Sequence, residues 1–409
     1  MSNVEAARNV SVRDRVTAVV QRRKPDRLPF VGRLEVWYAC HSRAGTLPTE
    51  FRDVPVDSIY RAVGMGRQRF MAPFVWRLRG VEMVVSFNGE EIHRETQPLV
   101  DLFCGTHDRV SLDKAGETVT QYITPLGTLQ TRHELVELGV ATGTEPYVKE
   151  HFIKEESDYP ALEYLLERAE YVPQYEKVRH EQERLGEMGF VIPMPPRVPF
   201  QQLLLEYLGE VQLFYALHDS PRPVERLMQV LDEQLTAILH HLANLAVPYV
   251  EFPDNLHGLM TNPGLFRKYS LPSYQRYCDI LHAQGKKVGS HTDGNVKPLL
   301  LLLKESGLDV CESFSPAPLT ECTLGEAWHA WQDGPIIWGG IPSPLLEERT
   351  GEREFRDYLE HVLDLVGNGP VILGVVDMVM GHNSLDRIRY IAQRLEGHVV
   401  GGTQSACLR

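Results

Sequence analysis

Cysteine is scarce in this sequence and never occurs in closely spaced pairs. Six cysteines are scattered over 409 residues without a Cys-x-x-Cys spacing: Cys40, Cys104, Cys278, Cys311, Cys322 and Cys407. This distribution is typical of free thiols in a reducing compartment, and it does not suit a disulfide framework. We therefore expect a cytoplasmic protein.

Long apolar runs and an excess of positive charge are absent as well. No run approaches 18 apolar residues, and the start, "MSNVEAARNVSVRDRV", lacks the apolar core of a secretory signal, so we expect neither a transmembrane helix nor secretion. Lysine and arginine number 42 against 55 acidic residues, which gives a net charge of -13. Because nucleic acids and anionic membranes need a basic face, we expect neither as a partner.

The sequence does contain a regular alternation of strand-like and helical segments from about residue 187 onward. "GFVIPM" is followed by helical segments, and five further strand-like runs each precede a helix: "VPYVEFPD", "KKVGSH", "LDVCESF", "PIIWGGI" and "PVILGVVD". Such alternation indicates βαβ units and a parallel sheet. We predict an α/β fold, a (β/α)8 TIM barrel. A doubly wound sheet is the alternative, which the lack of a Gly-x-Gly-x-x-Gly or P-loop motif disfavours.

Two segments before this alternation have a different character. Residues 11–23 place valines at helical spacing, which predicts an N-terminal helical extension. Residues 80–135 are rich in β-formers, with turn signals at Asn88-Gly89 and Leu126-Gly127, and predict an inserted antiparallel β-hairpin subdomain. We expect residues 1–409 to form a single barrel domain that carries this insertion.

Ionisable side chains follow four of the predicted barrel strands. In a TIM barrel the carboxyl ends of the strands form the site, so these side chains are expected near one rim: Glu251 and Asp254, His291 and Asp293, Glu312, and Asp377. One histidine with several carboxylates is a plausible metal set, and zinc accepts such ligands. A structural explanation stays open, because Asp293 suits a helix N-cap, a lone histidine is commonly hydrogen-bonded, and Glu312 suits an arginine partner.

Other residues are weaker candidates for contact with a substrate. Arg197, after "IPMPP", suits an anionic substrate or a structural ion pair equally well. Phe200, Phe252 and Trp338 are candidates for the wall of a pocket, with core packing as the alternative.

Three stretches of the sequence resemble the uroporphyrinogen decarboxylase-like superfamily. They are residues 249–310, beginning "YVEFPDNLHGL", residues 336–373, beginning "IIWGGIPSPLLEE", and "KPDRLPF" near the start. The resemblance implies a (β/α)8 barrel with one of two activities. One is porphyrinogen decarboxylation, and the other is zinc-dependent methyl transfer to or from corrinoid proteins.

The motifs within the resemblance favour the methyltransferase branch. The decarboxylases carry an "RQAGRY" segment, whereas this sequence has "FVGRLEVWYACHSRAGTLP" in that region. The methyltransferases have "H-x-C-G-N" and a later Cys or His ligand. Here "HTDGN" keeps His291 and places Asp293 at the cysteine position, and "VILGVVD" places Asp377 at the third. "TPLGTL" at 124–129 is also similar to this branch. The resemblance therefore implies His291, Asp293 and Asp377 as metal ligands.

This harder ligand set predicts the demethylating half-reaction. A His/Asp/Asp zinc centre suits Lewis-acid polarisation of an ether oxygen, so we expect a small O-methyl donor such as an aryl methyl ether. Glu251, Asp254 and Glu312 are the catalytic candidates, with Glu251 or Glu312 completing the metal shell or protonating the leaving oxygen. No "DxHxxG" segment is present, so a partner protein would supply the corrinoid. A homodimer is compatible with this interpretation.

Two other interpretations remain open on the sequence. A metal-independent decarboxylase or lyase would use His291, Asp293 and Asp377 to orient a carboxylated substrate. A non-catalytic barrel would instead serve as a binding or assembly partner.

Overall fold

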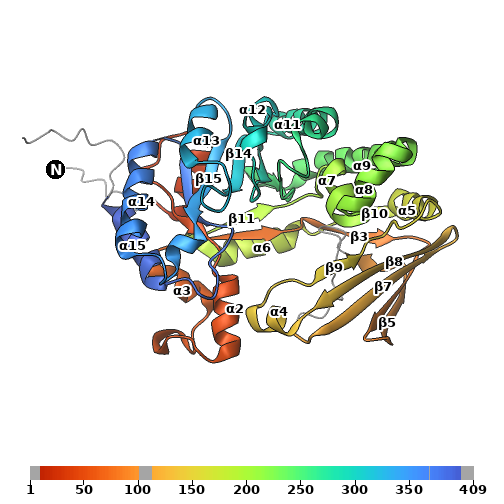
Figure 1. Ribbon diagram of the computed structural model, residues 1–409, viewed down its shortest axis with the longest axis horizontal. Coiled ribbons are helices and arrows are strands. Elements are labelled where there is room, and N and C mark those ends of the chain that lie inside the picture. Colours follow the sequence, from red (N-terminus) through yellow and green to blue (C-terminus); the bar gives the residue numbers. More distant parts are fainter. Residues whose placement is uncertain (1–9, 101–112, 368, 398–409) are drawn as a thin grey trace, which may run out of the picture.

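The computed structural model describes residues 10–100, 113–367 and 369–397, and eight parallel strands form its centre (Figure 1). They occur in two sheets, β1-β2-β11 and β12-β13-β14-β15-β16. A parallel bridge between Phe30 and Leu373 joins β16 back to β1, and β11 lies beside β12 without a ladder between them in the described residues. The strands are β1 (Val31–Gly32), β2 (Gly66–Met71), β11 (Gly189–Pro193), β12 (Tyr249–Phe252), β13 (Lys287–His291), β14 (Val310–Phe314), β15 (Ile336–Pro342) and β16 (Val371–Val376). The predicted (β/α)8 barrel is confirmed.

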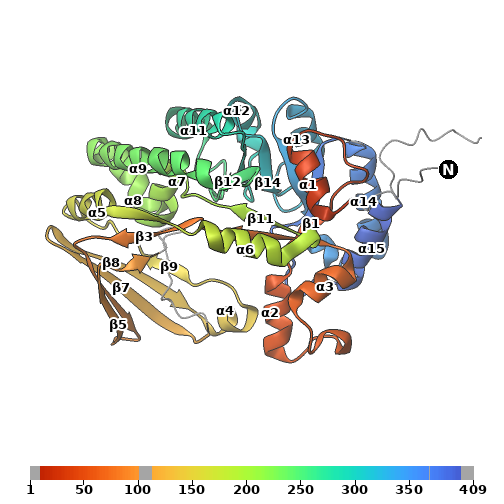
Figure 2. The same cartoon turned by 180° about the vertical axis from the view of Figure 1, so that it is seen from behind.

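Helices connect these strands and cover the outside of the barrel, as Figures 1 and 2 show. Those of the barrel are α2 (Glu35–Ala44), α3 (Val56–Val63), α6 (Tyr175–Leu185), α7 (Pro199–Gln202), α8 (Glu210–Asp219), α9 (Pro221–His241), α10 (Pro263–Leu265), α11 (Leu271–Ala283), α12 (Leu300–Glu305), α13 (Leu324–Ala330), α14 (Glu352–Val366) and α15 (Leu385–Glu396). Within the described residues, none is long and apolar enough to cross a membrane. The cysteines in this part of the chain are free thiols, and Cys104 and Cys407 lie outside it.

The N-terminal helix α1 (Val12–Val20) covers the amino-terminal end of the barrel. It begins with a capping box, in which the Ser11 hydroxyl accepts from the Asp14 backbone N–H and the Asp14 carboxylate reaches back to Ser11. Val16 and Val19 pack on the apolar residues that fill the barrel from below. The helical extension thus closes one end of the barrel.

A large antiparallel insertion leaves the barrel after β2 and returns before β11 (Figure 1). Its strands form a five-stranded sheet in the order β5-β4-β7-β8-β9 and a three-stranded sheet in the order β10-β3-β6. These strands are β3 (Phe74–Leu78), β4 (Glu82–Phe87), β5 (Glu90–Thr96), β6 (Leu99–Val100), β7 (Gly116–Thr124), β8 (Gly127–Leu135), β9 (Tyr147–Glu150) and β10 (Ala169–Pro173), with α4 (Glu137–Thr142) and α5 (Asp158–Glu167) beside them.

The antiparallel region is wider than the expected hairpin subdomain at 80–135. It runs from Phe74 to Pro173, because β10 pairs with β3 across almost the whole insertion. The turn between β4 and β5 has positive φ at Asn88 and Gly89, as a two-residue hairpin turn requires.

Aromatic residues fill the barrel below its carboxyl rim. Trp338 lies 6.1 Å from Tyr249 and 6.4 Å from Phe190 between ring centroids, and all three are buried. Gly289 on β13 lies beside Tyr249 of the neighbouring strand β12, and a Cβ added to Gly289 would overlap the Tyr249 hydroxyl. A glycine is therefore needed there for the strand to pass the aromatic layer.

Replacing Gly289 by Ala should destabilise the protein by about 1–3 kcal/mol, the usual cost of overpacking a core. The Tyr249 ring is fully buried, and its hydroxyl donates to Glu251 at 2.7 Å, so it has little room to move. Urea unfolding measures the change. Gly325→Ala is the matched control, because its Cβ would meet nothing within 4 Å. An unchanged midpoint for Gly289→Ala would contradict this packing.

Candidate metal centre

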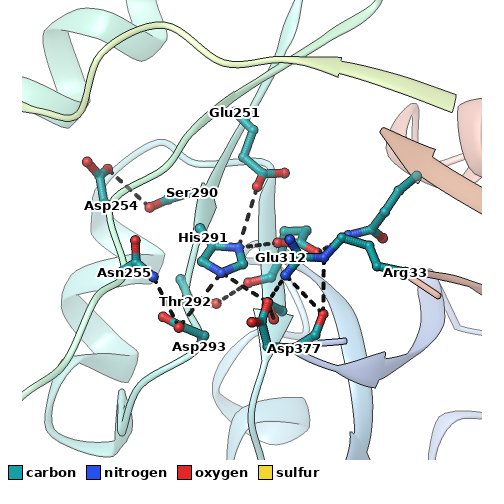
Figure 3. A network of polar contacts seen from close by, with 12 residues as sticks. Arg33, Glu251, Asp254, Asn255, Ser290, His291, Thr292, Asp293, Glu312 and Asp377 are labelled. Atoms are coloured by element: carbon teal, nitrogen blue, oxygen red, sulfur yellow. Dashed lines mark hydrogen bonds and ion pairs between the residues drawn. The ribbon is translucent and has the colours of Figure 1, made fainter. Parts of the chain in front are cut away.

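His291 ends β13 and lies at the meeting point of four barrel strands (Figure 3). Glu251 reaches it from β12, Glu312 from β14, and Asp377 from the residue after β16. The imidazole is buried, with 8% of the side chain exposed. The ionisable groups that the sequence placed at separate strand ends therefore surround one imidazole, with different partners on its two nitrogens.

The Nδ1 side of His291 faces two fully buried carboxyl groups. Glu312 Oε2 lies 2.5 Å from Nδ1, and Glu251 Oε1 lies 3.8 Å away. Gln68 Nε2–H donates to the other Glu312 oxygen at 2.8 Å. The Tyr249 hydroxyl donates to the second oxygen of Glu251. This side of the imidazole is thus a hydrogen-bonded network inside the barrel.

The Nε2 side faces the barrel mouth and two carboxylates that are partly exposed. Asp377 Oδ1 lies 3.4 Å from Nε2 and Asp293 Oδ2 lies 3.8 Å from it. The Asn255 amide donates to Asp293 at 3.1 Å. Arg33 donates to the carboxylate and the backbone carbonyl of Asp377. About a third of the Asp377 side chain and 27% of the Asp293 side chain are exposed, so this side is open to a ligand.

Two overlapping groups of donors could hold an ion: Glu251, His291 and Glu312, or His291, Asp293 and Asp377. Tetrahedral zinc with bonds of about 2.1 Å places its donors about 3.4 Å apart. The Nε2 distances of 3.4 and 3.8 Å fit that spacing. The 2.5 Å between Nδ1 and Glu312 is too short for an ion between them and suits a charge-assisted hydrogen bond. The second group is therefore the better metal site.

The pKa values of the ionisable side chains around His291 are shifted by burial and by one another. Burial and the neighbouring Glu312 raise the pKa of Glu251 well above its usual value. Burial alone would lower the pKa of His291, but Glu312 and Asp377 more than offset this and raise it. Burial would raise the pKa of Asp377, yet His291 and Arg33 hold it well below the usual range. The mouth of the site is therefore anionic at Asp377, as a cation site requires.

Two strained backbone positions support the carboxylates at the mouth. Asn255, which donates to Asp293, has φ 47°, and Ser313, whose hydroxyl lies 3.4 Å from Asp377 Oδ1, has φ 57°. Each costs on the order of 1–3 kcal/mol in a residue other than glycine. Such strain is found where surrounding structure fixes a functional geometry, and here both positions touch a candidate ligand.

Asp254 does not join the group around His291. Its carboxylate accepts from the Val198 backbone N–H at 2.9 Å, from the Ser290 hydroxyl at 3.2 Å, and from the Tyr274 hydroxyl. Burial raises the pKa of Asp254 to about 6. Asp254 thus links the loop after β12 to β13 and α11, and its expected catalytic role stays a prediction.

The four residues expected to contact a substrate pack elsewhere. Arg197 pairs with Glu206 at 2.6 Å and donates to Asn255 at 3.0 Å, so it belongs to a buried ion pair behind Asp293. Phe200 stacks on Tyr269, Phe252 packs on Tyr274 and Tyr277, and Trp338 belongs to the aromatic layer. The three aromatic side chains are at most 1% exposed and pack in the core, and their expected contact with a substrate stays a prediction.

Three residues of the site were not predicted from the sequence: Arg33, Gln68 and Phe70. Phe70 lies edge-on to His291, with 6.0 Å between ring centroids, and the Arg33 guanidinium lies 4.9 Å from the Phe70 ring centroid. Gln68 and Phe70 come from β2, "GRQRFM", whose arginines hide its strand character. The available signal was the alternation of Gln68 and Phe70 with Arg67 and Arg69.

Comparison with known proteins agrees with this architecture. The family model "Uroporphyrinogen decarboxylase (URO-D)" matches residues 202–366. No curated protein sequence matches the chain significantly. A solved methyltransferase from Methanosarcina mazei superposes with a TM-score of 0.55 at 12% identity, covering 95% of this chain and 99% of that chain. A D-psicose 3-epimerase with D-tagatose from Clostridium cellulolyticum H10 reaches a TM-score of only 0.32 at 12% identity, over 55% of this chain and 81% of that one. This similarity is too low to support a conclusion about the fold. Residues 202–366 are thus similar to the uroporphyrinogen decarboxylase family, and the chain shares its barrel fold with a methyltransferase.

Proposed function

We propose that the protein is a metal-dependent methyltransferase, with zinc as the metal. It would demethylate a small O-methyl donor, such as an aryl methyl ether, and pass the methyl group to the Co(I) corrinoid of a partner protein. The observation that carries the proposal is that His291, Asp293 and Asp377 bring one ligand atom each within 4.8 Å of one another at the barrel mouth. The shared fold with a methyltransferase is consistent with it.

The residues around this point have separable tasks in the proposed reaction. His291, Asp293 and Asp377 would hold the metal, which supplies Lewis-acid polarisation of the donor's ether oxygen. Phe70 offers an aromatic wall beside His291. The Arg33 guanidinium, next to Asp377, would stabilise the negative charge that develops on the leaving oxygen.

In this proposal Glu251 and Glu312 neither bind the metal nor protonate the leaving oxygen, the two roles that the sequence suggested for them. Both lie on the Nδ1 side of His291, behind the ring as seen from the mouth. They are fully buried, so neither reaches a donor bound at Nε2. In the proposed mechanism they support the imidazole and do not protonate the leaving oxygen.

The test is methyl transfer itself. The zinc-loaded protein should convert a Co(I) corrinoid protein to the methylcobalt form in the presence of a methoxylated aromatic donor, followed by absorbance. Gly325→Ala, on the outer helix α13, should transfer at the wild-type rate. No transfer from O-, N- or S-methyl donors would refute the proposal.

One observation favours a second candidate, a metal-independent decarboxylase. The family model that matches residues 202–366 is that of a decarboxylase, and Arg33 places a partly buried cation at the mouth of the site. Under this alternative the protein would release CO2 from a carboxylated substrate equally fast after exhaustive treatment with a chelator. The methyl-transfer proposal predicts that chelation abolishes activity and that added zinc restores it.

A further inference from the structure

Gln68 is a buried polar residue for which the proposed reaction has no direct use. It lies on β2, is 3% exposed, and points into the barrel. Its amide N–H donates to Glu312 Oε1 at 2.8 Å, while Glu312 Oε2 lies 2.5 Å from His291 Nδ1. A carboxylate whose two oxygens each face a donor is an acceptor on both sides. The three residues therefore form one chain that ends on the imidazole.

Two carboxyl groups face Nδ1, and only one lies within hydrogen-bond distance of it. Glu312 is at 2.5 Å and Glu251 at 3.8 Å, although both are fully buried on nearby strands. Glu251 is held away by the Tyr249 hydroxyl, and its Oε1 accepts no hydrogen bond from the described residues. The Glu312 backbone carbonyl also accepts from the N–H and the hydroxyl of Thr292, each at 2.8 Å.

We infer that Gln68 and Glu312 are positioning residues for the metal centre, an inference that rests on the proposed metal site at Nε2. Gln68 keeps the Glu312 carboxylate turned to His291, and Glu312 keeps the hydrogen on Nδ1. The lone pair of Nε2 is thereby left for the ion between Asp293 and Asp377. A hydrogen-bond partner on the second nitrogen fixes the orientation of a histidine ligand and increases its basicity.

The geometry indicates what loss of Gln68 would do. Without this donor, Glu312 Oε1 would lose its bond to the Gln68 amide, and the carboxyl group would be free to turn further toward the nearby Glu251. The imidazole would then lose the contact that sets its angle. Because the two carboxylate ligands are held separately by Asn255 and Arg33, they would stay in place while the nitrogen ligand drifted.

The test is Gln68→Met, which keeps the side-chain volume and removes the donor. Zinc affinity, measured by competition with a chelator, should fall about 10- to 100-fold, the usual effect of losing a ligand's hydrogen-bond partner. Glu312→Ala should weaken binding at least as much, and Glu312→Gln less, because its amide oxygen still accepts from Nδ1. The matched control is Gln284→Met, which removes a partly buried amide donor to the Leu239 carbonyl, at the carboxyl end of α11. Its affinity should equal that of the wild type.

A second readout needs no metal. The short bond between His291 Nδ1 and Glu312 should give a strongly downfield N–H proton signal in the zinc-free protein, lost in Gln68→Met and kept in Gln284→Met. If Gln68→Met keeps both the signal and the affinity, the inference fails while the metal centre stands. If the wild type binds no metal but the signal depends on Gln68, the proposed function fails while the positioning chain stands.

Discussion

Replacing His291 by Ala should abolish zinc binding and methyl transfer together. His291 is the only nitrogen donor of the proposed site, and its Nε2 lies 3.4 and 3.8 Å from the two carboxylate donors. Without the imidazole the site would keep only two carboxylate donors, and one of them, Asp377, also pairs with Arg33. Two donors hold an ion far more weakly than three. The loss of affinity should exceed the ~100-fold that removing a ligand's partner costs.

Titration calorimetry with zinc checks this result. The matched control is His329→Ala on helix α13, which removes a histidine whose ring bonds only the Gly325 carbonyl of its own helix among the described residues. That variant should bind one zinc with wild-type affinity. Stoichiometric zinc on His291→Ala, with an unchanged dissociation constant, would show that the ion binds elsewhere and would refute the centre described above.

Replacing Asp254 by Asn should remove a large pH dependence of stability. The folded-state pKa of Asp254 is raised from its ordinary value of 3.8 to about 6. Between these two values the folded protein holds a proton that the unfolded chain has released, so the stabilising contribution is complete below about pH 4. It is lost as the pH rises through about 6. The total is about 3 kcal/mol for a fully buried group, at 1.36 kcal/mol per pKa unit.

The substituted asparagine cannot ionise, so the comparison isolates this one group. Its amide oxygen can still accept from the Val198 N–H, and its amide hydrogens can face the hydroxyls of Ser290 and Tyr274. Urea unfolding at pH 4, 5.5 and 7 should show Asp254→Asn gaining about 3 kcal/mol relative to the wild type over that range. Asp333→Asn, at an exposed position, should show no such gain. A constant difference between the proteins at all three pH values would contradict the prediction.

The sequence was most informative for residues at the ends of easily recognised strands. His291, Asp293 and Asp377 each lie at or just after the end of a strand in a regular βα unit. The rule that barrel sites lie at the carboxyl ends of strands therefore placed them near one another. Phe252 shows that the strand-end rule must be combined with the alternation of side chains along a strand. Adjacent residues point to opposite faces, so a strand that turns Glu251 inward must turn Phe252 outward, toward α11.

The remaining parts of the barrel and of the site depend on contacts between distant segments, which local sequence patterns do not reveal. β1 has only two residues, and β2 interleaves arginines with its inward side chains, so neither shows an apolar period. Their positions are set by pairing with each other and with β11, far along the chain. The sequence also could not predict on which side of the imidazole the two glutamates lie. Their side-chain rotamers depend on hydrogen bonds, from Gln68 to Glu312 and from Tyr249 to Glu251.

The long insertion has a consequence for the order in which the protein folds. β2 ends at Met71 and its hydrogen-bonded neighbour β11 begins at Gly189, whereas β12 to β16 pair strictly with their successors. Pairing between distant segments is slow, so the five-stranded half should assemble first and the strands flanking the insertion last. All three proposed ligands belong to the early half, at the ends of β13 and β16.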